Sequence, residues 1–180
     1  MAVMNLELRR PAVAFQETYL SGLAELETDA DRARWVALWS AAPLDTPTRG
    51  FASYVQMLLA REQAVPKGFV TDTVYWAIRD GEMVGRISIR HELNEALRKE
   101  GGHTGYIVRP SVRKQGIATE MLRQILLTDR ARSIGRLLVT CDEDNLASEK
   151  AIRKNGGILE NVIEFGAGQQ RTKRFWISTS

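Results

Sequence analysis

The sequence predicts a mixed α/β fold (α+β, with a mixed sheet) in a single domain, and three observations support this. Residues 73–90 have the pattern strand, Asp-Gly turn, strand, which is typical of a β-hairpin. Residues 119–134 place apolar side chains at the spacing of a helix with one buried face. Residues 136–141 form a short apolar run typical of a buried strand. A chain of 180 residues that is 44% hydrophobic can bury one substantial core and is short for two domains.

The N-terminal part, residues 1–72, predicts one strand followed by helices. Residues 5–10 alternate between apolar and polar side chains, as a half-buried strand does. Helical spacing of apolar residues follows this strand, then recurs in a region that includes Trp39, and again over residues 51–63. Residues 42–50 predict a loop because of their Pro and Gly content.

The C-terminal part, residues 73–177, predicts strands that alternate with helices. After the hairpin, a β-like segment at residues 106–110 enters a basic turn and then the helix of residues 119–134. The strand at residues 136–141 leads through an acidic loop into a further helix. That helix is predicted to end at residues 155–157, Asn-Gly-Gly, because Asn and Gly accept left-handed backbone angles.

The basic turn is suited to hold a diphosphate. The first turn of a helix has unpaired N–H groups and about half a positive charge from the macrodipole, which together stabilise an anion. Arg113 and Lys114 add full charges, Gly116 lets the backbone approach a ligand, and Ala118 keeps the next helical position small. The chain has neither a Walker A string nor a Gly-x-Gly-x-x-Gly string, so ATP and NAD sites of those types are not expected. The alternative is a solvated basic turn before an ordinary helix.

Composition and charge exclude several classes of protein. The net charge is +3, with Lys and Arg scattered among the acidic residues and no recognised nucleic-acid motif, so we expect no nucleic-acid partner. The sequence has no signal-peptide pattern and no apolar segment long enough to span a bilayer, so we expect no membrane partner. The single cysteine, Cys141, offers no disulfide framework and no metal cluster, which favours a reducing compartment, the cytoplasm. We expect Cys141 to be a small buried residue and not a nucleophile.

Two strings resemble signatures of the GNAT superfamily of acyl-CoA-dependent N-acyltransferases. The string Arg113-x-x-Gly116-x-Ala118 resembles its pyrophosphate loop. The string Asn145-x-x-Ser148, with Lys-Asn-Gly-Gly behind it, resembles its second signature, in a sparsely characterised branch. The resemblance covers roughly residues 73–177, and the preceding residues match only in general layout.

The resemblance implies a GNAT fold whose mostly antiparallel sheet is splayed near Val108, with acetyl-CoA as co-substrate lying in the splay and no metal. The acceptor would enter from the side made by the N-terminal helices. The residues that it implies for acyl-CoA binding are Ile107, Val108, Arg113, Lys114, Gln115, Gly116, Ile117, Ala118, Thr119, Asn145 and Ser148. For Asn145 and Ser148 the alternative is simple capping of the helix that follows.

The implied reaction needs a proton acceptor, because a free alkyl amine has a pKa of about 10.4 and is mostly an ammonium at neutral pH. His103 lies near the position where several superfamily members carry a catalytic carboxylate, and its alternative is a solvated histidine at the start of the strand. Glu92 and His91, at the end of the preceding strand, are the other candidates, with exposed polar residues as their alternative.

By the same resemblance the Val108 N–H would stabilise negative charge on the attacked carbonyl, worth about 3 kcal/mol. Many superfamily members place a Tyr after the Asn of the second signature to protonate the leaving thiolate, and that position is Ile152 here. Tyr106 or a water held by Ser148 could substitute.

The resemblance predicts an N-acetyltransferase for a primary amine, with a small-molecule amine as the first expectation and a protein N-terminus or lysine as the second. A rival from another class is a CoA-binding or protein-interaction module that has lost the chemistry, and Ile152 is its best support. Homodimers are common among proteins of this type, but no stripe of the sequence can be assigned to an interface.

Overall fold

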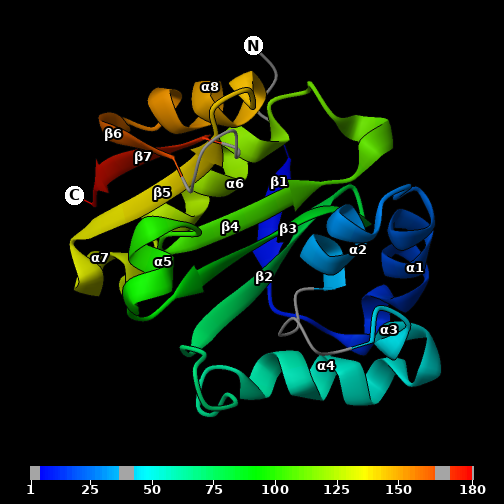
Figure 1. The fold of residues 1–180 in the computed structure, drawn as a ribbon. Coiled ribbons are helices and arrows are strands. Elements are labelled where there is room, and N and C mark those ends of the chain that lie inside the picture. The colour runs from blue at the N-terminus through cyan, green and yellow to red at the C-terminus, as the bar shows by residue number, and fades with distance from the viewer. Residues whose placement is uncertain (1–4, 37–42, 165–170, 180) are drawn as a thin grey trace.

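The computed structural model describes residues 5–36, 43–164 and 171–179; Trp39, expected above in a helix, lies outside them. The described strands form one seven-stranded sheet in the order β1-β2-β3-β4-β5-β7-β6 (Figure 1). The strands are β1 Leu6–Arg9, β2 Asp72–Arg79, β3 Glu82–Arg90, β4 Thr104–Val108, β5 Arg136–Asp142, β6 Ile158–Glu164 and β7 Arg171–Ser178. Every neighbouring pair is antiparallel except β4 and β5, so the prediction of a mixed, mostly antiparallel sheet is confirmed.

Helices cover both faces of this sheet (Figure 1). They are α1 Gln16–Ala24, α2 Asp29–Val36, α3 Thr46–Arg49, α4 Phe51–Ala60, α5 Glu95–Lys99, α6 Ile117–Leu126, α7 Asp129–Ile134 and α8 Leu146–Lys154, with short 3-10 turns η1 Val13–Phe15 and η2 Pro110–Val112. No helix in the described part of the chain is both long and apolar enough to cross a membrane.

The core is divided between the two faces. On one face, buried side chains of α6, α7 and α8 pack on the central and C-terminal strands, with Met121 and Ile152 fully buried. On the other, aromatic side chains of α1, α2 and α4 pack on β2 and β3, with Tyr19, Trp35 and Trp76 fully buried. Burial of such large apolar surfaces is the main stabilising contribution to this fold.

The β2–β3 hairpin forms as its local chemistry predicts. Asp80 and Gly81 both have left-handed backbone angles, with φ of 53° and 84°. A two-residue turn with both φ values positive matches the twist of the strands that it joins. The Asp-Gly signal therefore places the turn correctly, and the pairing next to it, Arg79 with Glu82, shifts by one residue between Ala77 and Ile78.

One helix prediction and one loop prediction differ from the structure. The expected helix of residues 119–134 is two helices, α6 and α7, because the Thr128 hydroxyl accepts from the Ala131 N–H and caps a new helix there. The loop expected at residues 42–50 contains the short helix α3 in its described part. Pro47 lies in the first turn of α3, where a missing N–H costs nothing.

The sheet opens between β4 and β5. These two parallel strands are paired only at Thr104 and Val139, near the start of β4. Beyond that point they diverge, and among the described strands none pairs with the C-terminal end of β4 on this side. The splay expected near Val108 is therefore present.

Candidate active site

The edge of β4 that faces β5 is open at Val108. The Arg109 N–H donates to the Val84 carbonyl of β3 at 2.9 Å. Because neighbouring residues of a strand direct their backbone groups to opposite edges, the Val108 N–H and carbonyl face the β5 side. In the part of the chain that the structure describes, no strand pairs with that edge at Val108, since β4 and β5 are paired only at Thr104 and Val139. A backbone N–H is thus directed into the splay.

Ile107 differs from Val108 in this respect. By the same alternation its backbone groups face Arg86 of β3, its partner in the register. Its side chain is buried in the aromatic cluster of the other face. The geometry therefore favours Tyr106 and Val108, and not the expected Ile107, as the residues of β4 with backbone groups at the open edge.

The basic turn leads directly into α6 with left-handed geometry. Lys114 has a φ of 64° and Gly116 a φ of 82°, immediately before the first helical residue. The first helical hydrogen bond runs from the Glu120 N–H to the Gly116 carbonyl. The N–H groups of residues 117–119 precede it and have no acceptor within the helix. This is the arrangement that binds an anion at a helix N-terminus.

Side chains from two other elements reach this turn. The Arg113 Nε donates to the Val108 carbonyl at 3.1 Å, and its Nη2 lies 3.4 Å from Asp31 of α2. Arg79 of β2 donates from Nη1 to the Gln115 Oε1 at 2.8 Å. Arg113 therefore joins the splay to the turn, and Arg79 adds a cation that no local pattern in the sequence indicated.

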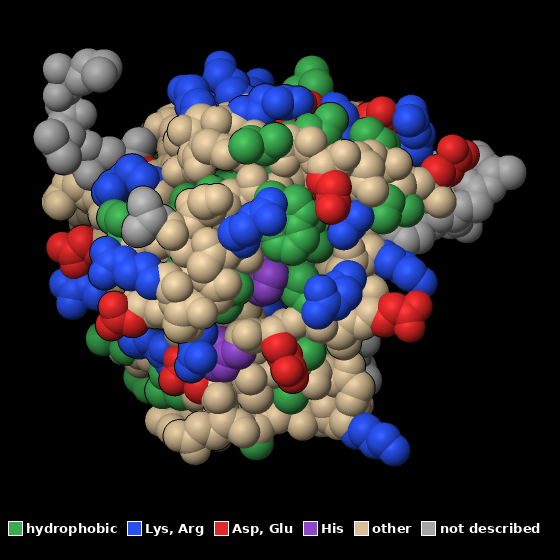
Figure 2. Space-filling view, turned by 90° about the vertical axis from the view of Figure 1, so that its left-hand side faces the viewer, with side chains coloured by type: hydrophobic (Ala, Val, Ile, Leu, Met, Phe, Trp, Pro, Cys, Tyr) green, Lys and Arg blue, Asp and Glu red, His purple; other side chains and the backbone are tan. Residues whose placement is uncertain are grey.

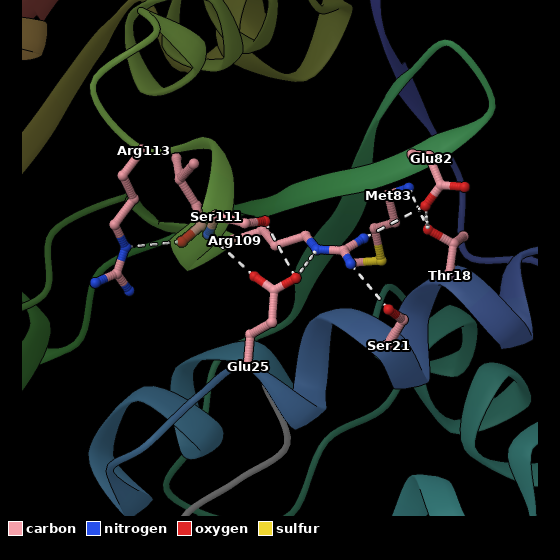
Figure 3. Close-up of polar contacts among 9 residues, drawn as sticks. Thr18, Ser21, Glu25, Glu82, Met83, Arg109, Ser111 and Arg113 are labelled. Atoms are coloured by element: carbon pink, nitrogen blue, oxygen red, sulfur yellow. Dashed lines mark hydrogen bonds and ion pairs between the residues drawn. The ribbon is translucent and has the colours of Figure 1, made fainter.

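A cluster around Glu25 holds the segment between β4 and α6 against α1 (Figure 3). The Glu25 carboxylate accepts from the Arg109 Nε at 2.6 Å, and from the Ser111 N–H and hydroxyl at 3.0 and 3.1 Å. The Arg109 Nη2 donates to the Ser21 hydroxyl at 2.8 Å. Burial alone would raise the pKa of Glu25, but the bonds from Ser111 and Arg109 outweigh it and lower that pKa.

This cluster was not predicted from the sequence. Arg109 directly follows Val108, so its fixed position also fixes the end of β4. Glu25 is 84 residues away along the chain, and a lone glutamate near a helix end has no distinguishing signal. Only the fold brings the two together.

A pair of hydroxyl groups connects β4 with α8 beside the splay. The Tyr106 hydroxyl and the Ser148 Oγ lie 2.6 Å apart. Burial raises the pKa of Tyr106 to about 12, so this hydroxyl is protonated at neutral pH. Cys141 is buried close to Ser148, as expected of a small core residue, and burial raises the pKa of its thiol to about 11.

Asn145 caps α8. Its Oδ1 accepts from the Ser148 N–H at 3.0 Å, as expected if Asn145 caps the helix. A contact of Asn145 with CoA stays a prediction. Ile152 is fully buried in the core under α8. The position that carries a tyrosine in many superfamily members thus has an apolar packing role here.

His103 lies just before β4, at the opposite end of this strand from Val108. Five extended residues span about 16 Å. The His103 Nδ1 accepts from the Leu138 N–H at 2.9 Å, so the neutral ring joins β4 to β5. Burial, with Arg98 and Arg90 nearby, lowers the pKa of His103 to about 4. This geometry favours a structural role for His103 over the expected role as proton acceptor.

We expect His103 to make the fold sensitive to mild acid. Its folded pKa lies below the ordinary value of about 6.5, so the unfolded chain binds more protons between about pH 6.5 and 4. The contribution of His103 to the free energy of unfolding is fully present above that window and is lost as the pH drops through it. The loss is at most about 3 kcal/mol, because solvent screens part of the effect. Thermal unfolding from about pH 7.5 to about pH 4.5 should destabilise the wild type more than His103→Asn, which retains an acceptor without titrating. Equal acid sensitivity would contradict this.

His91 and Glu92 lie at the same end of the sheet as His103, because β3 is antiparallel to β4. The two ring nitrogens of His91 lie 3.0 and 2.9 Å from the hydroxyls of Thr71 and Thr73, and burial lowers its pKa. Glu92 is exposed beyond the end of β3. Figure 2 shows both histidines of the chain on one face of the molecule, with Lys and Arg side chains near them. The geometry favours none of the three candidates as a base at the open edge of β4.

The splayed mixed sheet, with a basic turn and a helix N-terminus after the open strand, is the fold class of the N-acetyltransferases. The chain belongs to the acetyltransferase (GNAT) domain family, whose model matches residues 6–158. A comparison with curated protein sequences gave no significant match.

Solved structures share this fold. The ribosomal L7/L12 α-N-protein acetyltransferase RimL in complex with coenzyme A has a TM-score of 0.66 and 22% identity, over 99% of this chain and 96% of that chain. The microcin C7 self-immunity acetyltransferase MccE in complex with acetyl-CoA and AMP has a TM-score of 0.65 and 15% identity, over 97% and 92%. The putative acetyltransferase yncA from Salmonella typhimurium with acetyl-CoA has a TM-score of 0.56 and 15% identity, over 99% and 95%. At these identities the likeness establishes the fold.

Proposed function

We propose that this protein is an N-acetyltransferase that moves an acetyl group from acetyl-CoA to a primary amine by direct attack in a ternary complex. The observation that carries the proposal is the position of Val108, whose N–H lies at the open edge of β4 and whose carbonyl accepts from the Arg113 Nε of the basic turn. One element thus offers a donor for a carbonyl oxygen, and the next offers a site for a diphosphate. The proposal treats the chain as one domain, with residues 1–72 forming the acceptor side and residues 73–177 the CoA side.

The residues of the turn fit acetyl-CoA. The free N–H groups of residues 117–119 and the Lys114 ammonium would hold the diphosphate, and Gly116 leaves the backbone open to it. The open edge of β4 would bind the amide groups of the pantetheine arm in the manner of an added strand. Further contacts with acetyl-CoA are proposed for Val108, Arg113, Gln115, Asn145 and Ser148. The exposed side chains of Lys114 and Gln115 lie on the surface of the turn, where a ligand reaches them.

Acetyl-CoA supplies an activated thioester for attack by the amine. The Val108 N–H donates to the carbonyl oxygen as negative charge develops there, worth about 3 kcal/mol. The Ser148 hydroxyl donates a proton to the departing sulfur and regains one from the Tyr106 hydroxyl, 2.6 Å away, which is reprotonated from water. The acceptor nitrogen loses one proton to water before it attacks and a second to water as the amide forms, since the three expected bases lie at the far end of the sheet.

Removing this hydroxyl pair is expected to slow turnover. Ser148→Ala should lower kcat about tenfold, a modest loss because a thiolate with a pKa of about 8.5 leaves tolerably without an acid. Tyr106→Phe should lower kcat less, because Ser148 retains its proton and exchanges it with water. Steady-state rates at saturating acetyl-CoA test this, with Ser133→Ala on the exposed side of α7 as the matched control. An unchanged kcat in both variants would exclude the pair as the proton donor.

The acceptor that we propose is a small-molecule amine, and a protein N-terminus is the second candidate. The fold itself serves both, because MccE is a self-immunity enzyme against a microcin while RimL acetylates a ribosomal protein. On that face the aromatic side chains of α1, α2 and α4 pack over β2 and β3 in a buried cluster, which favours the small molecule.

The test is amine-dependent release of the CoA thiol. The protein is incubated with acetyl-CoA and a panel of amino sugars, polyamines, amino acids and a peptide with a free N-terminus. Release with small amines supports the proposal, and release with the peptide alone supports the protein acceptor. Binding of acetyl-CoA without release by any amine would overturn the enzyme and leave the CoA-binding module.

A further inference from the structure

Arg86 lies in the middle of β3, on the face that α1, α2 and α4 cover. Its cross-strand neighbours are Trp76 of β2 and Ile107 of β4, both in the hydrophobic cluster of that face. Arg86 is thus a deeply buried cation, 6% exposed. It directly follows Gly85, whose partner Val108 lies at the open edge of β4.

The Arg86 guanidinium has few partners for a buried cation. Its Nη1 donates to the Arg34 carbonyl of α2 at 2.7 Å, while its Nε is buried without a hydrogen-bond partner. Within the described ranges, no carboxylate forms an ion pair with it. Asp72, whose charge acts on it, is held by Arg61 through bonds of 2.6 and 2.9 Å. Burial lowers the pKa of Arg86 to about 10, which leaves it charged at neutral pH.

The same strand shows how a structural arginine is satisfied. Arg90 lies on the same face of β3, and its Nη1 donates to the carbonyls of Gly101 and Gly102 at 2.8 and 2.9 Å. Arg86 lacks a comparable set. A buried charge without a contacting anion is costly, and buried charges in proteins are usually paired.

We propose that Arg86 binds an anionic group of the acceptor, so that the acceptor is a primary amine that also carries a carboxylate or a phosphate. The inference rests on the proposed function and names its substrate class. The Nε and Nη2 atoms form one edge of the planar guanidinium, and two parallel N–H groups on such an edge match two oxygens of a carboxylate or phosphate. The Nη1 atom, bound to α2, fixes the orientation of that edge.

The position of Arg86 also limits the size of the acceptor. The backbone of Arg86 lies one strand, about 4.8 Å, away from β4, and its side chain extends from there to the Arg34 carbonyl of α2. An acceptor that reaches from this guanidinium to the open edge of β4 is a small molecule with a short linker between its anionic group and its nitrogen. Small amino acids and aminoalkyl phosphates meet this condition, whereas polyamines lack the anion.

Acceptor binding is tested with β-alanine, O-phosphoethanolamine and the neutral amine propylamine. Each is titrated calorimetrically into protein saturated with CoA, which requires no turnover. We expect wild-type protein to bind one or both anionic amines at least 30-fold, or about 2 kcal/mol, more tightly than propylamine. Arg86→Met should remove this preference and leave the dissociation constant of acetyl-CoA unchanged. The carboxylate and phosphate arms show which anion is recognised.

The matched control is Arg90→Met, which removes a partly buried arginine from the same face and should keep the preference. Arg86→Lys retains the charge without the planar edge, and should show an intermediate preference even if Arg86→Met unfolds. Equal preference in the wild type and in the folded Arg86 variants overturns the inference, as does wild-type protein without any preference. A failure of the proposed function can be told apart from a failure of this inference. In the first case, thiol release is absent while the binding preference persists.

Discussion

Gly116→Glu is expected to abolish measurable acetyl-CoA binding, raising the dissociation constant at least 100-fold. Gly116 directly precedes α6 with a φ of 82°, so a side chain there strains the backbone by about 1–2 kcal/mol. The new carboxylate would also lie where the diphosphate binds. Two like charges about 4 Å apart repel by about 4 kcal/mol at an effective dielectric constant of about 20. Both effects act on the same turn.

The matched control for this variant is Gly156→Glu. Gly156 has the same φ of 82°, follows α8, and has open space where a Cβ would be placed. It therefore carries the same backbone strain and the same added charge away from the turn. Calorimetric titration should give wild-type affinity for Gly156→Glu and none for Gly116→Glu. Unaltered affinity in Gly116→Glu would remove the diphosphate from this turn.

Val108→Pro is expected to lower kcat about 100-fold while changing the affinity for acetyl-CoA much less. Proline removes the backbone N–H that we assign to the carbonyl oxygen, and one such donor is worth about 3 kcal/mol. The substitution is structurally tolerable for a specific reason. The Val108 N–H faces the edge of β4 that no strand pairs with, so proline removes no bond of the sheet.

Val108→Ala is the control, because it shortens the side chain and keeps the N–H. Its kcat should stay within about threefold of wild type, a loss below about 1 kcal/mol. Thermal unfolding shows whether the proline variant keeps its fold. A folded Val108→Pro protein with wild-type kcat would contradict the role of this N–H, whereas equal losses in both variants would assign the effect to the side chain.

The parts of the fold that the sequence predicted are those set by local chemistry. The hairpin at Asp80 and Gly81 and the end of α8 before Gly156 follow from the few residues that accept left-handed angles. The turn before α6 is equally local, since its cations Arg113 and Lys114 lie within a few positions of Gly116. The break between α6 and α7 escaped prediction because apolar spacing continues across it, while one cap at Thr128 ends the continuity.

The site was predicted only where its residues are close in sequence. The contact of Glu25 with Arg109 spans 84 residues and depends on how α1 is placed against β4. The role of His103 depends on the direction of its ring, which the Leu138 N–H fixes and no pattern reveals. Arg86 belongs to an alternating apolar strand, where an arginine gives no sign of being buried. Contacts of this kind become visible only once the layers are assembled.

The central claim is that acetyl-CoA binds in the splay between β4 and the turn before α6. The most direct measurement is a calorimetric titration of the purified protein with acetyl-CoA, with ATP and NAD as controls. We expect one site with micromolar affinity for acetyl-CoA and none for ATP or NAD. Absence of acetyl-CoA binding, or equal binding of all three nucleotides, would contradict it.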